Sequence, residues 1–260
     1  MKFIHVTDTH LIEPGQTLYG LDPLSRLEAC VADINRHHHD AAFAVFTGDL
    51  AHKGQLPAYR ALKAALTRLR CPVHLLLGNH DDRANFVDVF PDRPRDANGF
   101  VQFAFDTPAG RFVCIDTNEP GVSWGWLCQK RLDWLAAELD RNAGKPVYLF
   151  MHHPPFPVRL KRMDEIALQE PERFTRVVTG RTNIKHLFFG HLHRPIGGSW
   201  NGIPFTTMRA TSHQVALDFV TGGIVPGSHE PPAYAVVFLS DGLTVAHFHD
   251  FLDTTNTFNL

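Results

Sequence analysis

The sequence lacks the long apolar runs that a membrane protein needs. Its continuous apolar runs, such as residues 41–46, cover only a handful of residues, far below the about 20 residues that a helix needs to cross a bilayer. The first residues include His5, Asp8 and His10, where a secretory signal would be apolar. We therefore expect a cytoplasmic chain without a membrane partner.

Cysteine is scarce, and neither sign of charge dominates. The four cysteines form no C-x-x-C pair, which argues against a disulfide framework and against a thiolate zinc site. The 25 Lys and Arg residues nearly balance the 27 Asp and Glu residues, giving a formal net charge of -2. A protein that binds nucleic-acid polymers normally carries a basic footprint, so we expect no such partner.

Histidine is the abundant functional residue, with 17 copies in 260 residues. Histidine is a leading ligand for borderline metals and carries protons near neutral pH. No repeat or linker divides the chain, so we expect one domain over residues 1–260. Within it, the strand-rich portion 203–260 is a candidate cap or dimerisation segment, and a homo-oligomer is left open.

Short apolar runs alternate with helical patterns over the first two thirds of the chain. The runs are continuous, as in parallel strands that are covered on both faces. The predicted buried strands are Lys2–Thr7, Ala42–Thr47, Val73–Leu77, Phe112–Ile115, Val147–Met151 and His186–Phe189. Leucine-rich stripes at three- and four-residue steps predict helices that begin near Pro23 and Pro57, and a third around Leu135.

Other segments have the alternation of antiparallel strands. Phe100–Asp106 leads through a turn into the strand near Phe112, which predicts a hairpin. Further strands are expected at Ile203–Met208, Tyr234–Leu239 and Leu243–His249. We therefore predict an α/β fold of two mixed β-sheets packed as a sandwich and flanked by helices. The phenylalanines of the last portion are expected mainly in the core, with a subunit interface as the alternative: Phe219, Phe238, Phe248, Phe251 and Phe258.

Polar residues of metal-ligand type follow five of the predicted parallel strands. In open α/β sheets, sites form beyond the carboxyl ends of the strands, so residues distant in sequence meet at one edge. Each motif alone is weak evidence, but five in order are much stronger. The motifs are Asp8-Thr9-His10, Gly48-Asp49, Gly78-Asn79-His80-Asp81, His152-His153 and Gly190-His191-Leu192-His193.

This ordered set resembles the signature of the calcineurin-like metallophosphoesterase superfamily, which implies an αββα sandwich with its active site at the strand ends. The similarity is greatest to bacterial glycerophosphodiesterases and class III cyclic-nucleotide phosphodiesterases. It covers Asp8 to His193 without a gap. The subgroup resemblance is carried by Leu18-Tyr19-Gly20, Gly78 to Asp82, Met151 to Pro155, Met163-Asp164 and Ser212 to Val215.

The resemblance implies a dinuclear metal centre. Nitrogen and oxygen ligands without sulfur suit iron, manganese, zinc or cobalt, and do not choose among them. With two divalent ions, two carboxylates and one hydroxide, the centre keeps a charge of about +1 and attracts an anion. The implied ligands are Asp8, His10 and His193 for one ion, Asn79, His152 and His191 for the other, and Asp49 as the bridge.

The function implied by the resemblance is hydrolysis of small phosphodiesters, either cyclic nucleotides or glycerophosphodiesters. A metal-activated hydroxide would attack phosphorus in line with the leaving group. His80 is the expected catalytic residue that protonates the leaving alkoxide or stabilises the transition state. Asp81 is expected to orient a histidine. Asn79, His80 and His213 are the expected substrate-binding residues.

Several other motifs have simpler interpretations. His153 is expected to support the site rather than bind a metal, although strand parity does not separate it from His152. The run His37–His39 is expected at the surface, at the end of the first helix. Arg159, Lys161 and Arg162 fit a charged loop, or alternatively a loop that attracts phosphate. The segment 121–125 fits the G-x-S-x-G pattern of a hydrolase nucleophile, but Ser123 does not directly follow a strand.

Two other functions compete with a phosphodiesterase. A phosphomonoesterase or protein phosphatase could use the same dinuclear centre. A non-catalytic scaffold could keep the fold and lose the metals, as in the similar retromer subunit. The intact set of ligand-type residues argues against the scaffold.

Overall fold

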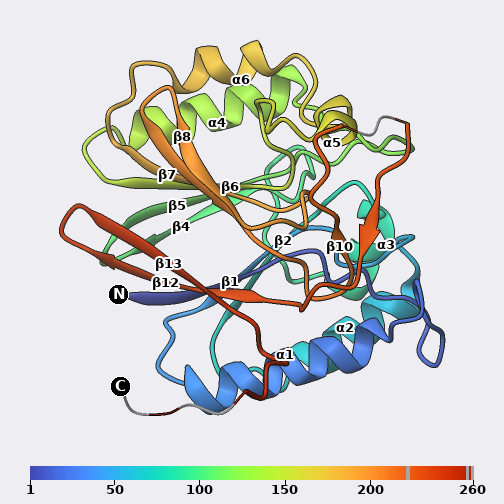
Figure 1. Ribbon diagram of the computed structural model, residues 1–260. Helices are drawn as coiled ribbons and strands as arrows, with labels where there is room; N and C mark the ends of the chain where they lie inside the picture. Colours follow the sequence, from blue (N-terminus) through green and yellow to red (C-terminus); the bar gives the residue numbers. More distant parts are fainter. Residues whose placement is uncertain (221–222, 256–257, 259–260) are drawn as a thin grey trace.

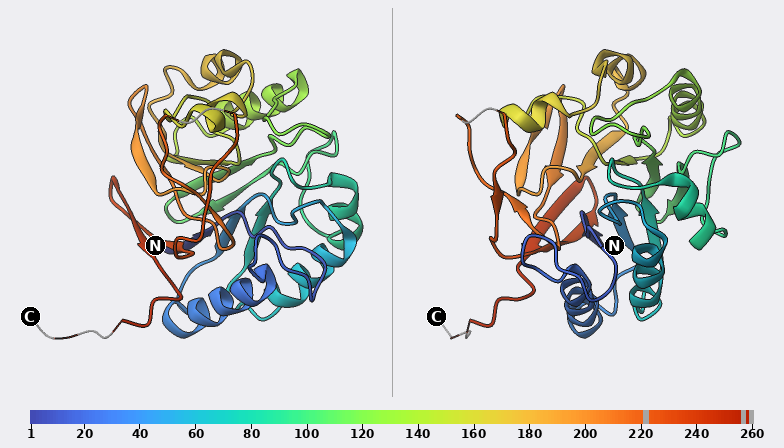
Figure 2. Two further views of the ribbon diagram at one scale, coloured as in Figure 1. Left: turned by 45° about the vertical axis from the view of Figure 1, so that its right-hand side comes forward. Right: turned by 90° about the vertical axis from the view of Figure 1, so that its right-hand side faces the viewer.

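Two β-sheets pack face to face, with helices on the outer face of each, in the computed structural model of the chain (Figure 1). The structure describes residues 1–220, 223–255 and 258. Two further views show helices on both sides of the stacked strands (Figure 2). This four-layer order of helix, sheet, sheet and helix is the predicted αββα sandwich.

The first sheet has five strands in the order β13-β12-β1-β2-β3. Its parallel part is formed by β1, β2 and β3, and β12 pairs antiparallel with β1 on the other side. The chain therefore returns after its second sheet to complete its first. The strands are β1 (Lys2–Val6), β2 (Ala44–Thr47), β3 (Val73–Leu76), β12 (Tyr234–Ser240) and β13 (Leu243–His249).

The second sheet has six strands in the order β4-β5-β6-β7-β9-β8. The predicted hairpin is formed by β4 and β5, which pair antiparallel from Phe103 opposite Cys114 to Thr107 opposite Gly110. Strands β5, β6, β7 and β9 are parallel. The strands are β4 (Phe103–Thr107), β5 (Gly110–Ile115), β6 (Val147–Met151), β7 (Ile184–Phe189), β8 (Ile196–Trp200) and β9 (Ile203–Thr207).

The helices bury apolar stripes against the outer faces of the sheets. Helix α1 (Pro23–His37) begins after Asp22, whose carboxylate accepts from the backbone N–H of Leu24 and Ser25. With α2 (Leu56–Leu66) and α3 (Arg83–Val89) it covers the first sheet. Helices α4 (Gln129–Arg141) and α6 (Pro171–Val178) cover the second sheet.

Aromatic rings fill the space between the two sheets. Phe3 of β1 stacks on Phe43 at 5.2 Å between ring centroids, and Phe150 of β6 stacks on Phe188 of β7 at 4.7 Å. Phe3 also meets Phe112, Phe150 and Phe188 edge-on. Buried aromatic pairs contribute about 0.5–1.5 kcal/mol each beyond the burial of their area. This layer fixes the two sheets relative to each other.

The strands of the strand-rich portion 203–260 belong to different parts of the fold. Strand β9 belongs to the second sheet and β12 and β13 to the first, while β10 (Gln214–Val215) and β11 (Gly227–Ser228) form a separate hairpin. The prediction that its phenylalanines lie mainly in the core is wrong. Only Phe251 is buried among the five, and Phe219, Phe238, Phe248 and Phe258 are exposed. Phe248 lies on the edge strand β13, Phe238 lies on the neighbouring β12, and Phe219 lies between the two strands of the β10–β11 hairpin.

None of the helices within the described residues is long and apolar enough to cross a bilayer. The structure adds elements that the sequence patterns did not predict. These are α3, α5 (Lys161–Glu165), α6, β8 and the β10–β11 hairpin. The role of residues 203–260 in dimerisation stays a prediction.

Candidate metal centre

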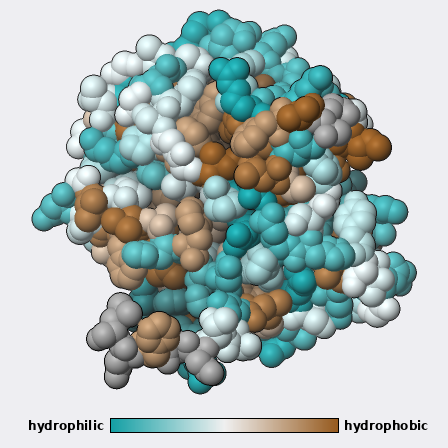
Figure 3. Space-filling model, viewed as in Figure 1, coloured by the Kyte–Doolittle hydropathy of each residue, from teal (hydrophilic) through white to brown (hydrophobic). Residues whose placement is uncertain are grey.

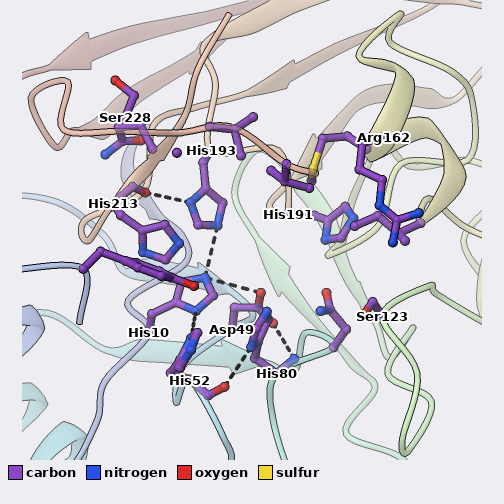
Figure 4. Close-up of a pocket in the computed structure, with 18 of the residues that line it drawn as sticks. His10, Asp49, His52, His80, Ser123, Arg162, His191, His193, His213 and Ser228 are labelled. Atoms are coloured by element: carbon purple, nitrogen blue, oxygen red, sulfur yellow. Dashed lines mark hydrogen bonds and ion pairs between the residues drawn. The ribbon is translucent and has the colours of Figure 1, made fainter. Parts of the chain in front are cut away.

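The expected ligands come together at the carboxyl ends of the parallel strands of both sheets. Five of their side chains line a cavity of about 730 Å³ (Figure 4), and those of Asp8 and His152 are buried behind them. The first sheet contributes the residues after β1, β2 and β3, and the second sheet those after β6 and β7. In chain order these residues are Asp8, His10, Asp49, Asn79, His152, His191 and His193.

Most of these residues adopt a left-handed backbone conformation. A positive φ is rare for residues other than glycine, costs about 1–3 kcal/mol, and is concentrated at functional sites. The values are 54° at Asp8, 44° at His10, 49° at Asp49, 68° at His191 and 48° at His193. The strained backbone conformation of these five residues therefore directs their side chains toward one point.

One group of side chains gathers around Asp8 and His10. The Nε2 atoms of His10 and His193 lie 3.1 Å apart. Asp49 Oδ2 lies 3.5 Å from His10 Nε2, and Asp8 Oδ1 lies 3.3 Å from His193 Nε2. These four residues form one of the groups whose ligand atoms all lie within 4.8 Å of one another.

A second group lies on the other side of Asp49. His152 Nε2 is 3.4 Å from Asp49 Oδ1 and 3.3 Å from Asn79 Oδ1. The rings of His152 and His191 are 5.2 Å apart. Asp49 thus presents one carboxylate oxygen to each group, which is the geometry expected of a bridging ligand.

Backbone carbonyl groups fix the orientation of two histidine rings. His193 Nδ1 lies 2.7 Å from the carbonyl oxygen of His213, and His152 Nδ1 lies 2.7 Å from that of Thr47. A carbonyl only accepts, so Nδ1 carries the proton and donates in both rings. In a neutral ring held in this way, Nε2 is the nitrogen that a metal ion can bind.

Burial and mutual charge shift the pKa values of the cluster. Burial opposes ionisation of Asp49, but neighbouring His152 and His80 hold its pKa well below the usual range. For His152, burial lowers the pKa, but the Asp49 and Asp8 carboxylates outweigh burial and raise the pKa to about 9. The two carboxylates therefore favour a second proton, on His152 Nε2, in the metal-free chain, and an ion that binds there must displace it.

The residues fit a metal site on an observation independent of any sequence motif. His191 Nε2 is buried and has no hydrogen-bond partner. Buried polar atoms normally have partners, so such an atom calls for an unseen one. It faces the same cavity as the carboxylates and imidazoles (Figure 4). A donor set of nitrogen and oxygen without sulfur suits borderline and hard divalent ions.

His80 and His213 both line the cavity above the cluster. His80 donates its backbone N–H to Asp49 Oδ1 at 2.8 Å, and its Nδ1 lies 2.7 Å from the carbonyl oxygen of His52. The ring of His213 lies 4.8 Å from the rings of His10 and His193. The sequence-based expectation that both residues lie at the site agrees with this placement.

Asp81 is buried beneath the cavity floor. Its carboxylate accepts from the backbone N–H of Leu50, Ala51 and Gly78 and from the hydroxyl of Tyr59. Burial and neighbouring Asp49 raise the pKa of Asp81 to about 6. Its hydrogen bonds therefore join the loops after β2 and β3 rather than orient a histidine ring, and a catalytic role stays a prediction.

The sequence reasoning missed His52, and it gave Tyr19 no role. The rings of His52 and His80 stack at 4.8 Å, and His52 Nδ1 lies 3.2 Å from His10 Nδ1. Tyr19 packs edge-on against His213 at 4.8 Å. His52 follows Asp49 by three residues, and this proximity in sequence is the one signal that could have indicated it.

Three residues with simpler expected roles also lie at or near the site. His153 is buried beside His191, with Nδ1 2.8 Å from the Thr117 hydroxyl and Nε2 without a partner. Ser123 and Arg162 line the cavity on the side of His191 (Figure 4). Arg162 also pairs with Glu165 in the same helical turn at 2.5 Å.

The family model described as calcineurin-like phosphoesterase matches residues 1–195. The chain belongs to the calcineurin-like phosphoesterase family. The matched range contains all of the expected metal ligands but not His213. This membership agrees with the resemblance and with the fold predicted from the sequence.

Curated relatives of this phosphoesterase extend the similarity over the whole chain. It is 47% identical over 263 residues to a probable cyclic nucleotide phosphodiesterase of Rhodopseudomonas palustris, covering 100% of this chain and 96% of the relative. It is 30% identical over 249 residues to a probable glycerophosphodiester phosphodiesterase of Arcobacter nitrofigilis, covering 94% and 91%. A dimetal phosphatase of Danio rerio has the same fold, with a TM-score of 0.72, 17% identity and coverage of 97% and 96%.

Proposed function

We propose that this phosphoesterase hydrolyses small phosphodiesters at a dinuclear metal centre. The observation that carries the proposal is the position of Asp49, with one oxygen toward each of two groups of buried ligand-type side chains. The proposed ligands are Asp8, His10 and His193 for one ion, Asn79, His152 and His191 for the other, and Asp49 for both.

Iron, manganese, zinc and cobalt all fit the donor set, and we propose that the ions are drawn from these. When bound, two such ions supply hydroxide at neutral pH and stabilise the charge that develops on the phosphoryl oxygens. Asp8 and Asp49 together bring two negative charges, and Asn79 is neutral. The loaded site therefore keeps a positive excess that suits a monoanionic diester.

We assign proton transfer to His80. The carbonyl of His52 accepts from His80 Nδ1–H, so Nε2 is the ring atom that remains to exchange a proton with the substrate. The backbone N–H of His80 binds Asp49, which ties the position of the ring to the bridging ligand. Asn79 and His213 are proposed to contact the phosphoryl oxygens from either side.

The walls of the cavity bear on the substrate class. Above the polar floor, the lining includes the apolar or aromatic side chains of Tyr19, Ile166, Val215 and Ile224. A cavity of this kind favours a diester whose alcohol part has a flat or apolar body. Together with the name of the relative at 47% identity, this supports cyclic nucleotides over glycerophosphodiesters.

The test of substrate class is a panel at fixed Mn²⁺ concentration. It compares 3′,5′-cAMP, 2′,3′-cAMP, glycerophosphocholine, glycerophosphoethanolamine and p-nitrophenyl phosphate. We expect the highest kcat/KM for a cyclic nucleotide and the lowest for the monoester. A preference for the monoester would contradict the proposal, and a preference for a glycerophosphodiester would contradict the assigned class alone.

The metal centre is tested with bis(p-nitrophenyl) phosphate and the variants Asp49→Asn and Asn79→Ala. Even partners outside the ligand set typically contribute about 10–100-fold in metal affinity or activity, so we expect each variant to lose at least about 100-fold in kcat/KM. Asp92→Asn, at an exposed carboxylate, is the matched control and should retain the parent rate. Parent-like turnover of Asp49→Asn would reject the centre.

Two further expectations stay predictions. These are the cytoplasmic location and the homo-oligomer expected from the sequence. Size-exclusion chromatography with light scattering measures the second directly.

A further inference from the structure

A chain of buried hydrogen bonds leads from the aromatic layer between the sheets to the metal centre. His5 Nε2 lies 2.9 Å from the Thr47 hydroxyl, the Thr47 hydroxyl 2.8 Å from the Thr7 hydroxyl, and the Thr7 hydroxyl 2.6 Å from Asp8 Oδ2. All four side chains are at most 1% exposed. The chain joins adjacent parallel strands, β1 and β2.

The number of protons that each side chain can donate fixes the direction of every hydrogen bond in this chain. The Asp8 carboxylate only accepts, so the Thr7 hydroxyl donates its proton to Asp8 Oδ2. The contact between the two threonine oxygens then needs the Thr47 proton. Thr47 has no second proton to give, so His5 must donate to it from Nε2–H.

The Asp8 end of this hydrogen-bond chain determines which carboxylate oxygen is left for a metal ion. Oδ2 accepts from Thr7, and the backbone N–H of His191 is shared, at 3.1 Å from Oδ2 and 3.3 Å from Oδ1. Oδ1 is the oxygen that faces His193 Nε2, at 3.3 Å, and His10 Nε2, at 3.9 Å. Only Oδ2 is bonded to a hydroxyl, while Oδ1, which shares the His191 N–H, points into the cluster.

The packing around the chain protects this arrangement. A methyl group at Gly190 would overlap the Thr7 hydroxyl and the Thr47 carbonyl oxygen. Glycine at this position therefore lets the second sheet close directly over the hydroxyls and excludes water. The ring of His5 is held edge-on by Phe150 and Phe188 at 6.1 and 5.6 Å.

We propose that His5, Thr47 and Thr7 are positioning residues that hold Asp8 as a ligand through Oδ1 alone. The hydrogen-bond chain through these residues keeps Oδ2 bonded to the Thr7 hydroxyl. The Asp8 carboxylate therefore does not rotate to bind a metal ion with both oxygens. None of the three lines the cavity. The inference rests on the proposed metal centre but is independent of the choice of substrate.

The first test reads the ring proton of His5 in the unaltered, metal-free chain. Long-range ¹H–¹⁵N correlation spectra of ¹⁵N-histidine-labelled protein distinguish the two neutral tautomers. Burial lowers the pKa of His5 to about 3 although Asp8 opposes the shift, so the ring holds one proton at pH 7. We expect it on Nε2. A proton on Nδ1 would contradict the proposed direction of the hydrogen bonds from His5 to Asp8.

The second test measures Mn²⁺ binding to the metal-free chain by calorimetry. Thr7→Val keeps the shape of the side chain and removes the hydroxyl, while Thr7→Ser keeps the hydroxyl. Partners that orient a ligand typically contribute about 10–100-fold in metal affinity. We expect such a loss at one site in Thr7→Val and affinity near that of the parent in Thr7→Ser.

Thr9→Val is the matched control, because the equally buried Thr9 hydroxyl bonds to the Leu50 carbonyl oxygen instead of to a ligand. It should bind Mn²⁺ like the parent. Equal affinity of Thr7→Val and Thr7→Ser would overturn the inference and leave the proposed function standing. Failure of the parent to bind Mn²⁺ would instead reject the proposed centre. If Thr7→Val does not fold, the tautomer measurement decides alone.

Discussion

At the scale of single residues, His80 is where the proposed chemistry is tested most directly. Its Nδ1 is committed to the His52 carbonyl oxygen, so the Nε2 side alone serves the leaving group. General acids contribute about 10²–10⁴-fold in rate. We expect His80→Ala to lose this much with an alkoxide leaving group and far less with p-nitrophenolate, which needs no proton.

The measurement is kcat for a series of diesters that differ in the pKa of the leaving alcohol. Metal content is followed in the same samples, so that loss of ions is not mistaken for loss of an acid. An equal fall across the series would show that His80 acts by charge or hydrogen bonding and not by proton transfer. His39→Ala, at an exposed histidine, is the control.

Single residues also show how much of the site can be predicted from sequence patterns. Asp8, His10 and Asp49 were predicted because each follows an apolar run, and strand ends meet at one edge of a sheet. His52 was not predicted, because its contacts with His10 and His80 depend on how the loop after β2 folds back. The same holds for Ser123 and Arg162, whose places at the cavity are set by loops without a periodic pattern.

At the scale of elements, a histidine joins the edge strands of the two sheets, β3 and β4. His74 of β3 stacks on Phe105 of β4, with ring centroids 3.8 Å apart. Burial, assisted by the charge of Arg93, lowers the pKa of His74 to about 4. The folded chain therefore binds fewer protons than the unfolded chain between about pH 6.5 and 4, and stability falls as the pH falls through that window.

We expect His74→Phe to reduce this acid sensitivity. At pH 5 the effect is about 1 kcal/mol, after allowance for screening by solvent. Chemical denaturation of the metal-free chain at pH 7 and pH 5 measures it. His39→Phe should leave the pH dependence as in the parent, and an unchanged dependence in His74→Phe would exclude His74 as a contributor.

Strands were predicted more completely than helices and hairpins. Val147–Met151 and Leu243–His249 agree with the expected bounds, because continuous or alternating apolar runs carry a clear signal. β8 was missed, since Gly197 and Gly198 remove its apolar pattern and antiparallel pairing with β9 forms it. Apolar residues of the hairpin region, including Leu217 and Ile224, are exposed, and apolar atoms gather on that face (Figure 3).

At the scale of the whole molecule, the proposed centre joins the two sheets. Asp8, His10, Asp49 and Asn79 come from the first sheet and His152, His191 and His193 from the second. A ligand that binds only the folded state stabilises it by about 2.7 kcal/mol at a concentration of 100 Kd. We therefore expect Mn²⁺ to raise the Tm of the metal-free chain by about 5–10 °C.

Differential scanning calorimetry with and without Mn²⁺ measures this increment, and a chelator should reverse it. Asp49→Asn removes the bridge and should lose most of the increment, while Asp92→Asn should keep it. The same increment in Asp49→Asn as in the parent would mean that the ions bind elsewhere.

The pairing of β1 with both β2 and β12 has a consequence for the order of events during synthesis. β1 leaves the ribosome well before its partner β12, which begins at Tyr234. Until then one edge of β1 is bare, and His191 and His193 have only recently emerged. All seven proposed ligands are therefore available only after His193 has emerged, and the sheet that positions four of them is completed later still, when β12 pairs with β1.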